Sequence, residues 1–285
     1  MKTVKQAIND QHETPYSVLK HAQPEFAKFG VSQKTALVIV PTYNEALNIE
    51  PLLAAILAQG PEFDVLVIDD NSPDGTGDLV EKIIAQTPRV QLRRRPGKLG
   101  LGTAYIFGFK LALQQGYSFI FEMDADFSHQ PHYLPILLSM AVRDADVAVG
   151  SRNVPGAKVV NWSWKRNVLS KGGNIYARLI CGIPVHDFTG GFKCFRADVL
   201  RTIDLDAIQS TGYGFQVEVN YRCAKAGFRL VEYPIIFPDR VAGQSKMSGS
   251  IIREAALMVW WLRLNVHPEP QLQSVSTKSV SGADR

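Results

Sequence analysis

The sequence predicts an α/β protein built on a mostly parallel sheet with helices on both faces. Short apolar runs rich in β-branched residues alternate along the chain with segments of helical periodicity. We expect strands at residues 36–40, 65–68, 90–92, 119–121 and 147–149. We expect the intervening helices at about 46–58, 76–86, 103–115 and 131–142. Because the strands are apolar without alternation, both faces of the sheet must be covered.

The 285 residues predict one main domain with appendages. Residues 1–34 are polar and lack the apolar core of a signal peptide, so we expect a loose extension there. The main domain is expected at 35–246, an amphipathic helix at 247–266 and a disordered tail at 267–285. No run of 18 apolar residues occurs, so we expect no spanning helix.

Composition excludes several classes of protein. The net charge of +4 suits a phosphate-bearing ligand or an anionic membrane surface but is too small to indicate a nucleic-acid partner. The three cysteines have no C-x-x-C spacing, which argues against a disulfide framework and a zinc site. We therefore expect Cys181, Cys194 and Cys223 to be buried thiols.

Polar residues follow four of the predicted strands. Ligands of open α/β sheets bind beyond the carboxyl ends of the strands, so these segments are expected to form one site. A single acidic strand end is equally well explained as a helix N-cap, but four converging ends are not. The segments are Pro41-Thr-Tyr-Asn-Glu45, Asp69-Asp-Asn-Ser72, Asp124-Ala-Asp126 and Gly150-Ser-Arg152.

Asp124 and Asp126 stand directly after an expected strand. Carboxylate oxygens suit Mg²⁺ or Mn²⁺, which bridge to substrate phosphates with few protein ligands. Asp-x-Asp alone is common in solvated loops, and its position after a buried strand favours a metal site. Asp70 is expected to accept hydrogen bonds from a base or ribose, while Asp74-Gly-Thr76 forms a turn and a helix cap.

The segment around Gly100 and Gly102 partly matches a dinucleotide fingerprint. The third small residue would fall at Tyr105, so the fingerprint fails, and no P-loop motif occurs either. This argues against a dinucleotide-dependent oxidoreductase. We expect Arg93-Arg-Arg95, which precedes these glycines, to be a solvated loop.

Taken in order, the motifs resemble those of family 2 glycosyltransferases with the Rossmann-like GT-A fold, and more narrowly the dolichol- and polyprenol-phosphate mannose synthases. The resemblance runs from about residue 36 to 250. It rests on the strand ends already named and on Asp69–Thr76, Gly97–Tyr105, Met123–Asp126 and Thr189-Gly-Gly-Phe192. Where the family commonly has Thr-Ser-Gly-Phe followed by Arg, this chain has Thr-Gly-Gly-Phe followed by Lys193.

The resemblance implies a role for each matching position. The guanosine of GDP-mannose would be surrounded by Pro41, Tyr43, Glu45, Ile68 and Asp70, with Asp124 and Ala125 lining the nucleotide. Mg²⁺ or Mn²⁺ would be bound by Asp126, with Ser128 and Asp124 as further ligands. Diphosphate contacts would come from Arg152, Arg240 and Lys246, which with Asp126 form the expected catalytic set. The acceptor phosphate would meet Arg152, Arg166 and Ser170.

The implied reaction is an inverting transfer of mannose from GDP-mannose to a polyprenyl (dolichyl-type) monophosphate. The second pKa of a phosphate monoester is about 6, so the acceptor is already largely anionic at neutral pH. We therefore expect no essential general base. Glu218 is the best alternative base, and the favoured interpretation is a helix carboxylate that contacts a neighbouring Arg or Lys.

A polyprenyl acceptor would require contact with a membrane surface. Residues 162–180 and 251–264 combine tryptophans, basic residues and apolar positions, which suits peripheral attachment to the cytoplasmic side of a membrane. Arg253, Glu254 and Arg263 argue against a spanning helix. Amphipathic helices packed on the sheet explain the composition equally well, and a membrane-protein partner stays open.

Two alternatives of function stay open. A UDP-sugar, glucose-type polyprenyl-phosphate glycosyltransferase would share these motifs, although its relatives often carry added transmembrane helices. A nucleotide-sugar-binding module without catalysis is the non-enzyme alternative. The intact Asp124-Ala-Asp126 and the basic residues Arg152, Arg240 and Lys246 argue against that module.

Overall fold

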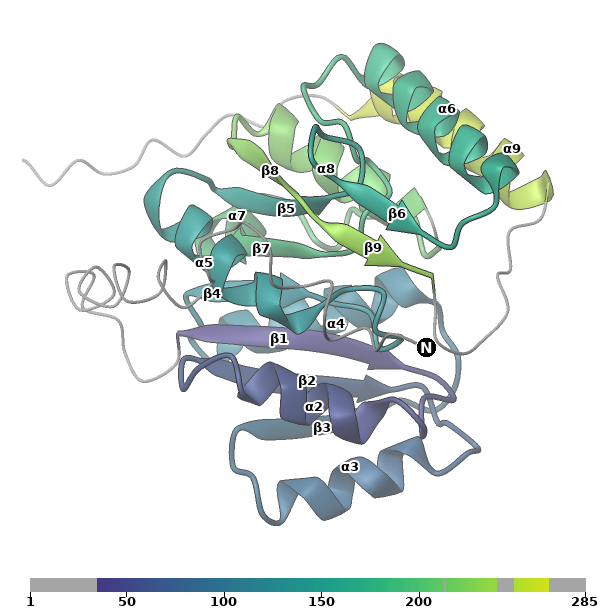
Figure 1. The fold of residues 1–285 in the computed structure, drawn as a ribbon. Helices are drawn as coiled ribbons and strands as arrows, with labels where there is room; N and C mark the ends of the chain where they lie inside the picture. The colour runs from purple at the N-terminus through teal and green to yellow at the C-terminus, as the bar shows by residue number, and fades with distance from the viewer. Residues whose placement is uncertain (1–34, 213, 240–248, 267–285) are drawn as a thin grey trace, which may run out of the picture.

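The computed structural model describes residues 35–212, 214–239 and 249–266, with side chains from 256 onward in the last range. A seven-stranded sheet runs through the centre of this part of the chain (Figure 1). Its strands are β1 (Ala36–Thr42), β2 (Phe63–Asp69), β3 (Val90–Arg94), β4 (Phe119–Glu122), β5 (Val147–Ser151), β7 (Lys193–Arg196) and β8 (Leu230–Pro234). Their spatial order is β3-β2-β1-β4-β7-β5-β8.

The sheet is parallel except at one strand. β1 pairs in parallel with β2 and β4, β2 with β3, and β5 with β8. β7 is antiparallel to both of its neighbours, β4 and β5. The carboxyl ends of the parallel strands therefore share one edge, and the segment that leads into β7 starts at that same edge. The prediction of a mostly parallel sheet is confirmed.

Helices cover both faces, as predicted. On one face, side chains of α2 (Ile49–Leu57), α3 (Thr76–Ile84) and α5 (Leu134–Arg143) share one buried cluster with alternate residues of β1. On the other face lie α4 (Leu101–Gln114), α7 (Ala197–Thr202) and α8 (Gly214–Lys225), whose buried side chains share a second cluster with the intervening β1 residues Leu37 and Ile39. Helix α2 begins at Ile49 rather than 46, and in the segment before it the N–H groups of Glu45 and Ala46 donate to Thr76 and Asp74.

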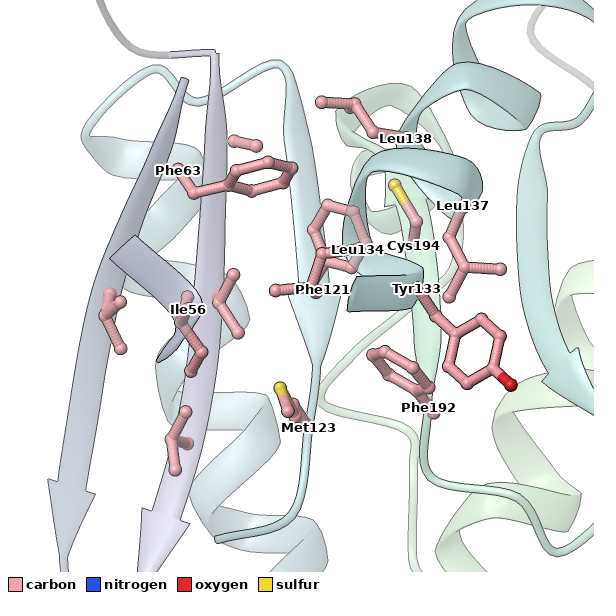
Figure 2. Close-up of a cluster of buried hydrophobic side chains, with 14 of the residues drawn as sticks. Ile56, Phe63, Phe121, Met123, Tyr133, Leu134, Leu137, Leu138, Phe192 and Cys194 are labelled. Carbon is pink, nitrogen blue, oxygen red and sulfur yellow. The ribbon is translucent and has the colours of Figure 1, made fainter. Parts of the chain in front are cut away.

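Part of the core lies beneath the predicted acidic turn. Figure 2 shows one buried cluster that contains Phe121 from β4, Met123 just after that strand, Leu134 from α5 and Phe192 from the segment before β7. The rings of Phe63 and Phe121 meet edge to face at 5.9 Å between centroids. This packing fixes the end of β4, from which the acidic residues extend.

The remaining elements all follow β4 along the chain. They are η2 (Pro131–Tyr133), β6 (Lys158–Val160), α6 (Trp164–Cys181), β9 (Ile236–Pro238) and α9 (Gly249–Asn265). β6 and β9 form a two-stranded parallel sheet. Helices α6 and α9 lie side by side (Figure 1), and Tyr176 donates to the carbonyl of Ala256 at 3.0 Å. Among the described residues, no helix is both long and apolar enough to cross a membrane.

Several expectations fall outside the described residues, among them those for 1–34, 267–285, Arg240 and Lys246. Within the described residues, the three cysteines are buried free thiols, which confirms the prediction. Burial raises the pKa of Cys181 to about 11, so this thiol stays protonated at neutral pH.

Candidate active site

The acidic turn directly follows β4. Oδ1 of Asp126 accepts hydrogen bonds from the backbone N–H of Ser128 at 3.0 Å and from its hydroxyl at 2.5 Å. Oδ1 of Asp124 accepts from the Tyr105 hydroxyl at 3.3 Å. Phe127, between Asp126 and Ser128, has φ +58°, a conformation that is uncommon for a bulky side chain. These bonds make the segment a compact turn.

His129 closes this turn and was not among the predicted site residues. Its Nδ1 accepts the backbone N–H of Asp124 at 3.1 Å. The ring is 2% exposed and stacks on Phe192, with 5.0 Å between centroids. Burial lowers the pKa of His129, against the opposing effect of Asp124. A neutral imidazole with an accepting Nδ1 agrees with this hydrogen bond.

The predicted nucleotide-binding residues lie at the ends of β1 and β2. Tyr43 is 38% exposed, with Lys98 Nζ 4.4 Å from the centroid of its ring. The side chains of Ile68 and Ala125 are buried in the core, so these two residues can offer a ligand only their backbone. Pro41 stands next to the last residue of β1, and Glu45 Oε2 accepts from Asn48 Nδ2 at 2.8 Å.

One expectation about this side of the site is partly wrong. Arg93 and Arg94 are exposed as expected, but they belong to β3 rather than to a loop, and Arg95 is buried. The Nε of Arg95 donates to Asp70 Oδ1 at 2.5 Å, and its Nη1 donates to Thr103 at 2.7 Å. Asp70 and Arg95 are 25 residues apart, which no local pattern reveals. The Arg95 guanidinium therefore fixes the orientation of the Asp70 carboxylate.

The expected phosphate-binding Arg152 is held by a buried acid. Its Nε and Nη2 donate to the two oxygens of Asp187 at 2.8 and 2.6 Å, and Nη2 also donates to Thr189 at 2.7 Å. The Asp187 side chain has no exposed surface. Burial acts to raise the pKa of Asp187, but the Arg152 guanidinium outweighs it and holds this pKa below its ordinary value. Asp187 was missed by the sequence analysis because it lies 35 residues from Arg152.

The expected acceptor-binding residues stand on α6, next to Arg152. Arg166 lies over the Trp162 ring at 3.9 Å and donates to Asp239 Oδ1 at 2.6 Å. Arg152 lies 5.8 Å from the centroid of the same Trp162 ring. Ser170 follows Arg166 by four residues on α6, so both occupy one side of the helix. The structure thus brings Arg152 and Arg166 together around Trp162, with Ser170 one turn further along α6.

A buried polar cluster underlies the turn. The Lys193 ammonium donates to Gln216 Oε1 and lies 3.3 Å from Glu122 Oε2. Burial raises the pKa of Glu122, and Lys193 opposes that effect. The Nε2 atom of Gln216 is buried without a hydrogen-bond partner, near Gly191. The described contacts of the Lys193 ammonium are therefore with the interior of the protein.

Glu218 does not stand ready as a base. Its carboxylate accepts from Arg222 at 3.0 and 2.8 Å and from the N–H of Ser210 at 3.0 Å. The side chain is fully buried. The interpretation of Glu218 as a helix carboxylate paired with a neighbouring arginine is confirmed.

The acidic turn fits a divalent cation that also binds phosphate. Among the described residues, no group of three or more His, Cys, Asp or Glu side chains could hold a metal ion. Mg²⁺ and Mn²⁺ often take one or two carboxylates and complete their coordination with water and substrate phosphates. Asp124, Asp126 and the Ser128 hydroxyl are oxygen donors within one short turn, and that donor set suits such an ion.

A match to a protein-family model identifies the family to which the chain belongs. Residues 37–204 match the model described as glycosyl transferase family 2, which covers more than half of the chain. The chain belongs to glycosyl transferase family 2. It is therefore a glycosyltransferase, and its sheet is the Rossmann-like GT-A fold expected of that family.

Relatives and solved structures agree with this family. An undecaprenyl-phosphate mannosyltransferase from Micrococcus luteus is 51% identical over 223 residues, 78% of this chain and 91% of the relative. A polyprenol monophosphomannose synthase from Mycolicibacterium smegmatis is 47% identical over 235 residues, 81% and 88% of the two chains. A structure of glucosyl-3-phosphoglycerate synthase from Mycobacterium tuberculosis with phosphoglyceric acid has a TM-score of 0.62 at 14% identity, covering 90% of this chain and 85% of that one.

Replacing Asp187 with Asn tests the buried ion pair. Since the pKa of Asp187 in the folded protein lies below its ordinary 3.8, its contribution to stability is present above that value and is lost as pH falls through the folded-state pKa. Asp187→Asn is expected to lower the free energy of unfolding by about 3 kcal/mol at pH 7, because Arg152 stays buried without its partner. Chemical denaturation should show this difference shrinking below about pH 4.

The matched control is Asp198→Asn, which breaks an ion pair between Arg201 and a side chain that is 85% exposed. We expect no measurable change from that variant. If the difference in free energy of unfolding between Asp187→Asn and the unmodified protein stayed constant from pH 7 down to pH 3, this account of Asp187 would be contradicted.

Proposed function

We propose that the protein transfers mannose from GDP-mannose to a polyprenyl monophosphate, with Mg²⁺ or Mn²⁺ bound. The observation that carries the proposal is the identity of about one half, over most of both chains, to two relatives that are named as polyprenyl-phosphate mannose enzymes. The geometry supports it, because one edge of the sheet holds an acidic turn and a basic cluster. Those two sides suit a metal-bound diphosphate and an anionic acceptor.

On the donor side, Asp126 and Asp124 would hold the metal together with the Ser128 hydroxyl. When bound, the cation would act as a Lewis acid that stabilises the departing diphosphate. A solved structure of similar fold, glucosyl-3-phosphoglycerate synthase, contains Mn²⁺ with UDP-glucose. The catalytic set would be completed by Arg152, Arg240 and Lys246, the last two of which lie outside the described residues.

The base and ribose would lie at the ends of β1 and β2, against Pro41, Tyr43, Glu45, Ile68 and Asp70. Because Arg95 donates a hydrogen bond to Asp70 Oδ1, the Asp70 carboxylate is already oriented before a nucleotide binds. One oriented carboxylate accepts from the N–H of guanine or of uracil. A UDP-glucose-type donor is therefore the second candidate.

On the acceptor side, Arg152, Arg166 and Ser170 would position the lipid phosphate. The guanidinium groups flank Trp162, and Arg166 would exchange its contact with Asp239 for the incoming anion. A phosphate monoester brings its own negative charge, so positioning replaces proton removal. The buried, arginine-bound state of Glu218 agrees with a reaction that uses no protein base.

Because the lipid tail of the acceptor lies in a membrane, the protein needs a surface that contacts the membrane, and helices α6 and α9 provide one. Large apolar side chains on these helices stay strongly exposed: Trp164, Val168, Ile175, Leu179, Leu257, Trp260 and Leu264 are each at least 51% exposed. Lys165 and Arg263 belong to the same helices, and basic residues beside tryptophans suit the headgroup region. We infer peripheral attachment to the cytoplasmic membrane face through these two helices.

The donor and the metal can be tested together. Purified protein is incubated with a short polyprenyl phosphate, Mg²⁺ or Mn²⁺, and in turn GDP-mannose, UDP-glucose and other nucleotide-sugars. We expect product with GDP-mannose alone, and loss of turnover by at least about 100-fold on chelation or in Asp126→Ala, since the metal supplies several kcal/mol of charge stabilisation.

Asp144→Ala, which removes an exposed acid beyond the end of α5, is the control and should retain full turnover. Equal product from UDP-glucose would favour the second candidate. Near-full activity of Asp126→Ala with the metal chelated would overturn the metal-dependent mechanism.

Membrane attachment is tested by flotation with vesicles that contain anionic lipid. The double variant Leu179→Glu with Leu257→Glu places charge on the exposed apolar side of α6 and α9. We expect its vesicle-bound fraction to fall at least about tenfold, because each buried leucine contributes more than one kcal/mol. Phe107→Glu, on the exposed side of α4, should float like the unmodified protein. Wild-type protein that stays unbound to vesicles would refute peripheral attachment.

A further inference from the structure

We propose that His129 is the positioning residue of the metal-binding turn, through the hydrogen bond that its Nδ1 accepts from the backbone of Asp124. The proposal rests on the proposed metal role of Asp124 and Asp126. His129 would touch neither metal nor substrate. It would fix where the two carboxylates point before either arrives.

The backbone at this point needs a partner outside the sheet. The pairing of β4 with β7 ends at Glu122 and Lys193, and the last N–H bonded to β1 is that of Met123, at 3.2 Å from the carbonyl oxygen of Ile39. The next N–H, that of Asp124, has left the sheet at a partly buried position, where a backbone donor without an acceptor costs free energy. His129 Nδ1 accepts it at 3.1 Å.

The imidazole itself is held in place by aromatic neighbours from outside the turn. It stacks on Phe192 with an interplanar angle of 16° and meets the edge of Phe237 at 5.4 Å. Phe237 also lies under the Arg152 guanidinium at 5.1 Å. His129 therefore links the acidic turn to the segment before β7 and to the arginine side of the site.

Several hydrogen bonds hold the turn. Ser128 donates to the Asp126 carboxylate, Gln130 Nε2 donates to the Phe127 carbonyl at 2.6 Å, Tyr105 donates to the Asp124 carboxylate, and His129 accepts the Asp124 N–H. Between Asp126 and Ser128, Phe127 has φ +58°, which a phenylalanine adopts only where its surroundings enforce it. The bond to His129 is the one that holds the backbone of Asp124, so without that acceptor the Asp124 carboxylate can shift relative to that of Asp126.

The test compares side chains that keep or lose the acceptor. In His129→Asn the amide oxygen takes the place of Nδ1, whereas His129→Leu has similar bulk and no acceptor, and His129→Gln moves the oxygen one bond outward. The first readout is hydrogen exchange of the Asp124 amide in metal-free protein. The second is Mn²⁺ affinity in the presence of GDP, measured by electron paramagnetic resonance.

We expect His129→Asn to keep the Asp124 amide protected and its Mn²⁺ dissociation constant within about threefold of wild type. His129→Leu and His129→Gln should lose the protection and weaken Mn²⁺ binding by about 10- to 100-fold, as outer-shell substitutions do. If the Leu variant does not fold, the comparison of Asn with Gln decides. Thermal melting of each variant distinguishes a local effect on the turn from global destabilisation, because global destabilisation would not depend on whether the side chain at position 129 keeps a hydrogen-bond acceptor.

Wild-type Mn²⁺ affinity and a protected amide in the Leu or Gln variant would overturn the proposal. So would a His129→Asn variant as weak and as unprotected as the Leu variant. Absence of Mn²⁺ binding in wild type would instead contradict the metal assignment. The amide exchange, which needs neither metal nor substrate, would still decide whether His129 holds the turn.

Discussion

The buried ion pair between Arg152 and Asp187 is the interaction on which the basic side of the site depends. Removing two charges from water is costly, and the structure offsets that cost with several hydrogen bonds. Asp187 accepts the side chain and the backbone N–H of Arg152, while the N–H of Asp187 donates to Glu232 on β8. With its position fixed in this way, the guanidinium can meet an anion without first ordering a flexible side chain.

The antiparallel strand β7 brings the two sides of the site together. It lies between β4, which ends at the acidic turn, and β5, which leads to Arg152. The segment before β7 supplies Thr189 to Arg152 and Phe192 to His129. The acidic turn and the Arg152 side of the site therefore meet across β7, which is the arrangement that the proposed metal-bound donor and anionic acceptor would need.

The sequence was sufficient for features that depend on local pattern. Buried strands appear as apolar runs, so the strand ends that carry Asp70, Asp126 and Arg152 were predicted with the right edge of the sheet. The partners of those residues were not, because an ion pair such as Asp70 with Arg95 joins distant segments. The antiparallel β7 was missed for a similar reason: four residues are too few for a periodicity, and only pairing defines their direction.

The central claim is that the acceptor phosphate is itself the nucleophile and that the protein supplies position and charge rather than a base. The most direct measurement is the pH dependence of kcat/KM with two acceptors, a polyprenyl phosphate and the corresponding phosphonate, whose second pKa is higher. The account predicts that the acidic limb lies near pH 6, at about the second pKa of the phosphate, and moves upward with the phosphonate. A limb that keeps its position with both acceptors would assign the ionisation to a protein base and contradict the account.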